Sequence, residues 1–106
     1  MTLGEIQTQL AVIDPDIRHY FSAGTGEAYT YWEETRRLPL TADDTHPDAD
    51  QAWRFYVHRF TKAENDTIAA NLFTALDANP GIAVMHRMAY ENDTGYIHHI
   101  FECEGY

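Results

Sequence analysis

The sequence has little cysteine, little positive charge and no long apolar run. A single cysteine, Cys103, excludes an intramolecular disulfide, so nothing in the chain indicates an oxidising compartment. Seven Lys and Arg against seventeen Asp and Glu give a formal net charge of −10. That charge argues against a conventional DNA-binding module, because such modules bind phosphates through cations that release counterions.

Membrane and export signals are also missing from the sequence. No segment approaches the roughly 18 apolar residues that a membrane-spanning helix needs. The first residues show no basic region followed by an apolar run, so they do not resemble a signal peptide. We therefore expect a soluble protein that has no membrane partner and is intracellular when made.

The composition is that of a folded protein. The chain has 106 residues, of which 44% are hydrophobic and 13% aromatic. A chain of this length and composition predicts a single domain, residues 1–106, built around one core.

Two segments carry apolar residues at helical spacing. The first starts with the capping-box spacing of Thr2 and Glu5 and predicts a helix from about Leu3 to Val12. The second follows the same spacing at Thr61 and Glu64. Its apolar stripe consists of Ile68, Leu72, Ala75 and Leu76.

The remaining apolar segments have the composition of strands. They are residues 17–21, 29–34, 53–60, 82–90 and 96–103. The last two are joined by Glu91–Gly95, which supplies Asn, Asp and Gly for a hairpin turn. The order predicts an α+β fold with a mostly antiparallel sheet of four or five strands, two helices on one face, and a C-terminal hairpin.

A long acidic loop is predicted at about residues 38–51. It carries four aspartates and no large apolar residue between positions 41 and 50, namely Asp43, Asp44, Asp48 and Asp50. The spacing and the glycine of a calcium-binding loop are missing, so a solvated loop explains the aspartates better. Loops of this length in compact domains are usually functional or disordered.

The C-terminal segment contains adjacent histidines, His98 and His99. Successive strand residues point to opposite faces, so the two cannot readily bind one ion together. If Tyr90 lies opposite Tyr96, His86 is diagonal to His98, and Glu102 follows on the same face. Those three residues are the candidate metal set, although polar residues of a sheet are the simpler interpretation. No catalytic motif surrounds Cys103, so no catalytic residue and no cofactor is predicted.

Large aromatic side chains occupy both faces of two predicted strands. They are Tyr29, Tyr31, Trp32 and Tyr56, together with Trp53. One interpretation is that one face forms the core and the other lies beneath the long loop or a terminus. The alternative is that the second face contacts another subunit, since exposed aromatic surface usually marks an interface.

The second half of the chain resembles a family of small phage proteins. The segment is AWRFYVHRFTKAENDTIAANLFTALDANPGIAVMHRMAYENDTGYIHHIFECEGY, residues 52–106. It is similar to the tail terminator, or tail-completion (minor tail), proteins of long-tailed bacteriophages, particularly those of Gram-positive hosts. The likeness lies in a strand that leads into an amphipathic helix ending in Ala-Leu. A hairpin with an acidic turn and a final strand beginning Gly95-Tyr96-Ile97-His98 follow.

The resemblance implies a structural role in the virion without catalysis. It implies a homo-oligomer, most typically a hexameric ring, that ends growth of the tail tube and provides the surface that joins the head. The partners would be the tail tube protein and head-tail connector proteins, and DNA would pass through without specific binding. The expected location is the head-tail junction, after a period in the host cytoplasm. The acidic loop would then project toward the lumen or the adjoining tube.

Three alternatives remain open at the level of sequence. A small metal-dependent enzyme or ligand-binding α+β protein would use His86, His98 and Glu102, with His58 as a further nitrogen ligand. An acidic inhibitor that mimics DNA is supported only by the charge and the small size. Another head-tail connector protein would share the fold and the acidity of a terminator.

Overall fold

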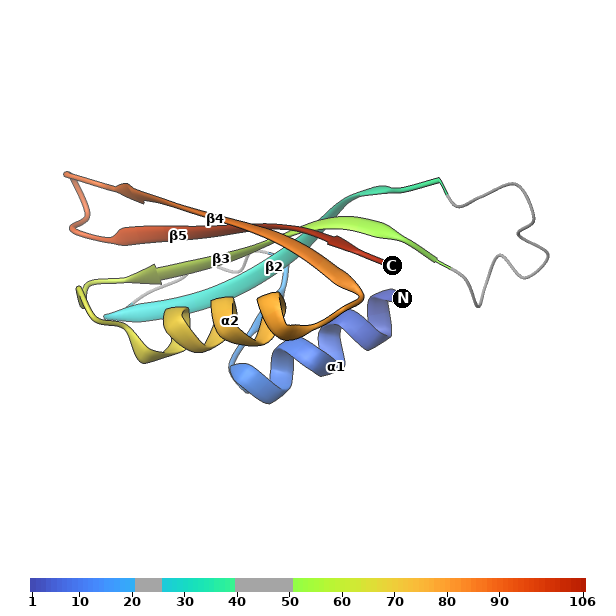
Figure 1. Cartoon of the computed structure of the whole chain (residues 1–106). Coiled ribbons are helices and arrows are strands. Elements are labelled where there is room, and N and C mark those ends of the chain that lie inside the picture. The colour runs from blue at the N-terminus through green and yellow to red at the C-terminus, as the bar shows by residue number, and fades with distance from the viewer. Residues whose placement is uncertain (21–25, 40–50) are drawn as a thin grey trace.

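Two helices lie on one face of a five-stranded sheet (Figure 1). The computed structural model describes residues 1–20, 26–39 and 51–106. Its elements are α1 Leu3–Ile13, β1 Arg18–His19, β2 Ala28–Arg37, β3 Trp53–Thr61, α2 Thr67–Ala78, β4 Ile82–Tyr90 and β5 Ile97–Gly105. The strand order is β1-β2-β3-β5-β4, antiparallel except where β1 runs parallel to β2. The predicted α+β class, the two helices on one face and the C-terminal hairpin are confirmed.

Helix α1 begins and ends with the capping groups that the sequence predicts. The Thr2 hydroxyl accepts a hydrogen bond of 3.1 Å from the backbone N–H of Glu5. Asp14 terminates the helix, and its backbone N–H still bonds to the Leu10 carbonyl. Ile6 and Leu10 are each only 1% exposed, so the apolar stripe of α1 faces the sheet.

Helix α2 begins five residues later than the capping-box spacing predicts, at Thr67 instead of Lys62. Its N-cap is Asp66, whose carboxylate accepts a 2.9 Å hydrogen bond from the backbone N–H of Ala69. Thr61 is instead the last residue of β3, and its hydroxyl accepts from the N–H of Ala63 in the turn that follows. The prediction that Thr61 starts the helix was wrong because long-range strand pairing takes priority over a local spacing.

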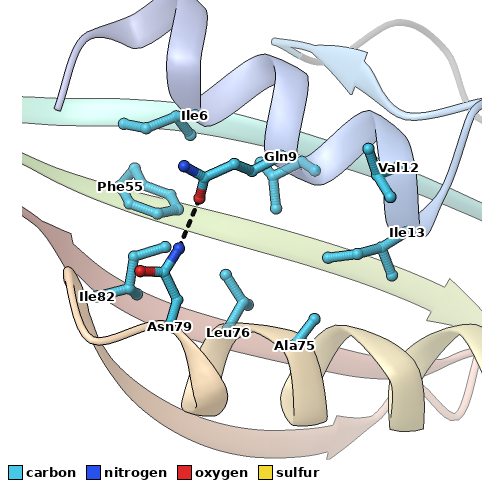
Figure 2. Close-up of a pocket in the computed structure, with 10 residues that line it drawn as sticks. Ile6, Gln9, Val12, Ile13, Phe55, Ala75, Leu76, Asn79 and Ile82 are labelled. Atoms are coloured by element: carbon cyan, nitrogen blue, oxygen red, sulfur yellow. Dashed lines mark hydrogen bonds between the residues drawn. The ribbon is translucent and has the colours of Figure 1, made fainter.

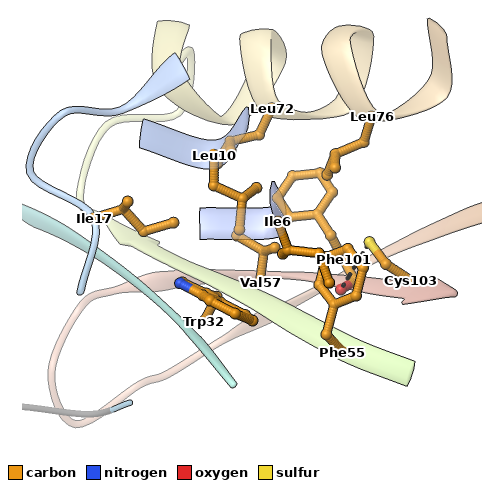
Figure 3. Packing of buried hydrophobic residues seen from close by; sticks show 10 residues of the cluster. All are labelled: Ile6, Leu10, Ile17, Trp32, Phe55, Val57, Leu72, Leu76, Phe101 and Cys103. Atoms are coloured by element: carbon orange, nitrogen blue, oxygen red, sulfur yellow. Dashed lines mark hydrogen bonds between the residues drawn. The ribbon is translucent and has the colours of Figure 1, made fainter. Parts of the chain in front are cut away.

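The core fills the space between the two helices and the sheet (Figure 3). Alternate residues of β2, β3 and β5 point toward the helices, as a pleated strand requires. The members from the sheet are Trp32, Phe55, Val57, Phe101 and Cys103, and those from the helices are Ile6, Leu10, Leu72 and Leu76. The face predicted for Phe55 and Val57 is therefore the buried one.

The hairpin register differs by one residue from the expected one. Tyr90 lies opposite Ile97, and Met88 lies opposite His99. The connection includes Tyr96, whose carbonyl accepts from the N–H of Glu91, and it contains Gly95 at a φ of 78°. A shift of one residue exchanges the faces of every side chain on one strand relative to the other, which alters the predicted site.

Two expectations concern the long loop and the membrane. Asp43, Asp44, Asp48 and Asp50 lie outside the described residues. In the part of the chain that the structure describes, neither helix is long and apolar enough to cross a membrane.

Candidate functional site

The three candidate metal ligands do not converge. His98 and Glu102 project from the face of β5 that lies away from the helices, because Phe101 and Cys103, at the alternate positions of the strand, belong to the core. His86 lies opposite Phe101 and therefore on the helix side of the sheet. Within residues 1–20, 26–39 and 51–106, no group of three or more His, Cys, Asp or Glu could hold a metal ion.

The two adjacent histidines belong to two separate hydrogen-bonded pairs. The Nε2 of His98 lies 2.9 Å from Nδ1 of His58 on β3. On the opposite face, Nδ1 of His99 lies 3.0 Å from Nε2 of His86 on β4. In each pair one ring must donate and the other accept, so the two rings of a pair cannot both be protonated while the bond exists.

Burial favours the neutral form of all four of these rings. Desolvation lowers the pKa of His98 to about 4, and the nearby His58 adds to that effect. The pKa of His58 is also lowered by burial, although the Glu33 carboxylate opposes the shift. The pKa values of His86 and His99 are lowered for the same reason, with burial as the largest cause. Neutral imidazoles can pack within a sheet, and the hydrogen bond within each pair gives each ring one polar partner.

Cys103 is unsuited to nucleophilic chemistry. Its side chain is 1% exposed, and burial raises the pKa of the thiol to about 12. A nucleophilic cysteine needs thiolate character and access, and this environment removes both.

The face of the sheet opposite the helices carries a continuous surface of rings, here called the aromatic face. Its members are Tyr29, Tyr31, Tyr56, His58, Phe60, Tyr96 and His98. Phe60 stacks on His98 and on Tyr29, with ring centroids 4.0 and 4.7 Å apart. Tyr31 stacks on His58 at 4.6 Å, and Tyr96 meets Tyr29 and Phe60 edge-on. Phe60 and Tyr96 were not predicted to belong to this face. The alternation Tyr56, His58, Phe60 along β3 does indicate that Phe60 shares a face with the other two.

Trp32 does not belong to this surface. Its side chain is completely buried on the helix side, where it packs edge-on against Phe55 at 6.1 Å. Trp32 was named with Tyr29, Tyr31 and Tyr56 as a possible interface residue, but neighbouring strand residues alternate, and the face of Trp32 is the one that the helices cover. The three tyrosines, by contrast, lie half-buried on the aromatic face.

Charged residues of both signs border the aromatic face. Arg54 lies between Arg36 and Glu104 in the cross-strand register, and Arg87 is aligned with Ile100. The Nε of Arg54 is buried and has no hydrogen-bond partner among the described residues. Ring surfaces within a charged rim are typical of protein interfaces, where aromatic and arginine side chains are enriched.

Strand β4 provides a second exposed surface, at the edge of the sheet. Its last six residues, Met85 to Tyr90, are all exposed, although they belong to regular strand. Met85 is 70% exposed, and Met88 and Tyr90 are each 64% exposed. Edge strands are usually protected by Lys, Pro or a bulge; β4 has no Lys or Pro, and its pairing with β5 is regular. The strand has the features of a surface that is covered in an assembly.

Comparisons with known proteins give a fold but no family. No protein-family model matches the chain, and no curated protein sequence matches it. Among solved structures, one chain of the "Virion of native gene transfer agent (GTA) particle" is similar, with a TM-score of 0.51 and 12% sequence identity. The alignment covers 94% of this chain and 89% of that one. At this identity the likeness establishes a shared arrangement of elements.

Proposed function

We propose that the protein is a structural protein of a phage-like virion, and specifically a tail terminator. In this role it forms a hexameric ring that ends growth of the tail tube and presents the surface to which the head joins. It works through contacts between surfaces and uses no catalytic residue or cofactor. Its partners are further copies of itself, the tail tube protein and the head-tail connector proteins.

The observation that carries this proposal is the structural likeness to a chain of a virion. The likeness extends over nearly the full length of both chains, so it concerns the whole fold and not one common motif. The resemblance of the second half of the sequence to tail terminators is a separate observation, and it indicates the same class of particle.

The surfaces support the same function. The described residues bring no candidate ligands or nucleophile together, whereas the aromatic face and β4 offer apolar area for protein contacts. An exposed edge strand together with exposed apolar side chains favours assembly over a monomeric role.

The subunit number is the first test of this proposal. Native mass spectrometry of the purified protein at high concentration should show a metal-free hexamer, and negative-stain images should show rings. A protein that stays monomeric at every concentration would contradict the ring. A monomer with stoichiometric zinc, iron or manganese would favour the metal-dependent alternative.

A second experiment separates a terminator from another connector protein. Tail tube protein from the same gene cluster is allowed to polymerise, and the purified ring is added during growth. A terminator should stop elongation and appear at one end of each tube in electron micrographs. Tubes that grow at an unchanged rate with bare ends would contradict this specific role.

The acidic segment gives a further test of the ring geometry. We propose that Asp43, Asp44, Asp48 and Asp50 line the lumen or meet the adjoining tube, where negative charge would repel passing DNA. Removal of residues 43–50 should change the melting temperature little, because loop-closure entropy varies slowly with length. The same deletion should reduce attachment to tubes, and a large loss of thermal stability would show that the segment supports the fold instead.

A further inference from the structure

An apolar groove lies between the two helices (Figure 2). Its volume is about 240 Å³, and Ile6, Leu10 and Leu76 are among the side chains that line it. The amide side chains of Gln9 and Asn79, which also line it, bond to each other at 2.7 Å. A lining of apolar side chains and one bonded amide pair accepts many apolar groups and selects none of them.

A second pocket, with a more specific chemistry, lies between α2 and the edge strand β4. Its volume is about 380 Å³. Phe73 and Thr74 of α2 line it from the helix, and His86 of β4 and His99 of β5 line it from the sheet. A buried apolar cavity of about 150 Å³ accepts a benzene molecule, so this pocket has room for a large side chain. We call it the histidine pocket.

The histidine pocket contains a buried ring nitrogen that lacks a partner. His99 is only 7% exposed, and its Nδ1 lies 3.0 Å from Nε2 of His86. The Nε2 of His99 is buried and has no hydrogen-bond partner among the described residues. A buried polar atom without a partner is unfavourable, so a group that enters the pocket and bonds to this nitrogen gains free energy.

The possible tautomers of the histidine pair indicate which group can supply that bond. If His86 donates to His99, the proton of His99 is on Nε2, which then needs an acceptor. In the other tautomer His99 donates through Nδ1, and its Nε2 needs a donor. A hydroxyl group can serve as either one. It fits the pocket whichever proton arrangement is present.

The walls of the histidine pocket favour a planar ring. Phe73 is 39% exposed, and its ring centroid lies 5.7 Å from that of His86. An aromatic group can pack against both rings, because aromatic pairs are favourable at such separations. Tyrosine is the side chain that combines an aromatic ring with a hydroxyl group.

The edge of β4 offers backbone groups to a partner's main chain. The strand pairs regularly with β5 along one side and is the last strand of the sheet on the other. An extended segment can add to such an edge, with main-chain hydrogen bonds for affinity and side-chain pockets for specificity. A segment added here would run beside His86, with the histidine pocket on its helix-facing side.

The opposite face of β4 indicates the residue next to the tyrosine. Arg87 lies opposite Ile100, which places it on the face away from the helices. Its side chain is exposed and forms no ion pair with a described residue. Adjacent residues of a strand point to opposite faces, so a segment with a tyrosine in the pocket places its neighbouring residue on the face of Arg87. An acidic residue there would pair with Arg87.

A second copy of the chain does not supply such a segment from its own edge strands. Neither β1 nor β4 contains an acidic residue, and they carry Arg18 and Arg87, respectively. Pairing with either strand would add positive charge near Arg87 and offer it no acid. The edge is therefore better matched by a different protein.

We infer that the edge of β4 and the histidine pocket bind an extended segment of a partner protein. The segment places a tyrosine in the pocket and an adjacent acidic residue beside Arg87. This inference adds a contact with another protein to the proposed function, and it does not depend on closure of a ring.

A synthetic peptide with blocked ends tests the surface directly. The probe is Thr-Val-Thr-Glu-Tyr-Thr-Val-Thr, and binding is followed by calorimetry and by hydrogen exchange. It should bind saturably and slow the exchange of alternate backbone N–H groups of β4. A peptide with Phe in place of Tyr should bind about fivefold more weakly, because His99 loses the hydroxyl. Equal binding of the two peptides would overturn the assignment of the pocket.

A charge exchange tests the position of the acidic residue. A peptide with Lys in place of Glu should bind the unmodified protein about threefold more weakly, as expected for an exposed ion pair. Arg87→Glu should reverse the order of the two peptides. An unchanged order in Arg87→Glu would show that the segment does not place its acid beside this residue.

Filling the pocket provides a matched pair of variants. Ala70 lines the histidine pocket and Asn71 does not, although both are exposed on α2. Ala70→Trp should weaken binding of the tyrosine peptide more than about tenfold, as blocking a central contact usually does. Asn71→Trp should bind like the unmodified protein, and circular dichroism should show both variants folded. Equal binding by the two variants would contradict the inference.

The outcomes separate this inference from the proposed function. A hexamer that binds none of the peptides would overturn the inference and leave the ring intact. A monomer that binds the tyrosine peptide would contradict the ring and support the surface. If the N–H groups of β4 already exchange as slowly in the peptide-free oligomer as in the complex, a second copy occupies the edge and the inference is wrong.

Discussion

The two faces of the sheet are built from the same strands, yet their aromatic residues serve different purposes. On the helix side, Trp32 and Phe101 are completely buried against α1 and α2. On the other side, the adjacent Tyr31 stacks on His58 and remains half-buried on the face that neither α1 nor α2 covers. Aromatic content is therefore a poor guide to the core in this chain. What distinguishes the faces is which one the helices cover.

The largest expected effect compares Trp32 with its neighbour Tyr31. Trp32→Ala should lower the free energy of unfolding by about 3–5 kcal/mol, because it leaves a cavity in a close-packed core. Tyr31→Ala removes stacking on an open face and should cost about 1 kcal/mol. Urea unfolding followed by circular dichroism measures both. Equal losses would show that the aromatic face contributes as much to the fold as the helix-covered face does.

A second comparison uses two arginines of β3 on opposite faces. Arg59 donates to both carboxylate oxygens of Asp66 at 2.8 and 3.0 Å and to the Thr30 hydroxyl at 3.0 Å. Arg59→Met should cost about 3 kcal/mol, because it leaves the carboxylate that caps α2 partly buried without its partner. Arg54→Met, on the other face, is the control and should cost less than about 1 kcal/mol. A small loss for Arg59→Met in the same unfolding experiment would contradict this account of the ion pair.

Acidification should weaken the protein through its histidine pairs. Because the pKa of His98 is lowered from 6.5 to about 4 in the folded state, the unfolded chain binds the proton first as the pH falls. Stability is therefore fully present above about pH 6.5 and declines toward pH 4. After allowance for solvent screening of this half-exposed ring, the loss at His98 between pH 7 and 5 should be about 1 kcal/mol.

His98→Gln is the variant that isolates this contribution. Carboxylates also titrate in the acidic range, so the informative quantity is the difference between the variant and the unmodified protein. Melting temperatures measured at intervals from pH 7 to 5 should fall less steeply for the variant. Parallel curves for the two proteins would exclude a role for His98.

The smallest expected signal comes from thiol labelling of the two faces. Cys103 should not react with iodoacetamide at pH 8 in the folded protein, since it is buried and its thiol pKa is raised to about 12. Glu102→Cys places a thiol on the adjacent, helix-free side and should take up one label per chain. Mass spectrometry counts the labels. Rapid labelling of the native Cys103 would show that β5 opens on the time scale of the reaction.

Much of the fold follows from local pattern, whereas the arrangement of the strands does not. The spacing from Thr2 to Glu5 predicts the start of α1, and the alternation from Trp53 to Val57 predicts the buried side of β3. The position of β5 between β3 and β4 depends on pairing between segments far apart in the sequence, as between His58 and Ile100. No local pattern carries that information.

The candidate site was harder to predict because it depends on register. One additional residue in the connection between β4 and β5 moved His86 to the opposite face from His98. Similarly, the capping-box spacing of Thr61 and Glu64 does not mark a helix start. Thr61 pairs with Ala28 and Ile97 in the sheet instead. In both cases a short-range rule was outweighed by contacts between distant segments.

The adjacent histidines of β5 also bear on how the sheet keeps its alignment. On one face of the sheet His98 is hydrogen-bonded to His58 of β3, and on the other face His99 is hydrogen-bonded to His86 of β4. If β5 slid by one position, both rings would change faces and both bonds would be lost together. Two consecutive side chains therefore favour a single register of β5 relative to both β3 and β4.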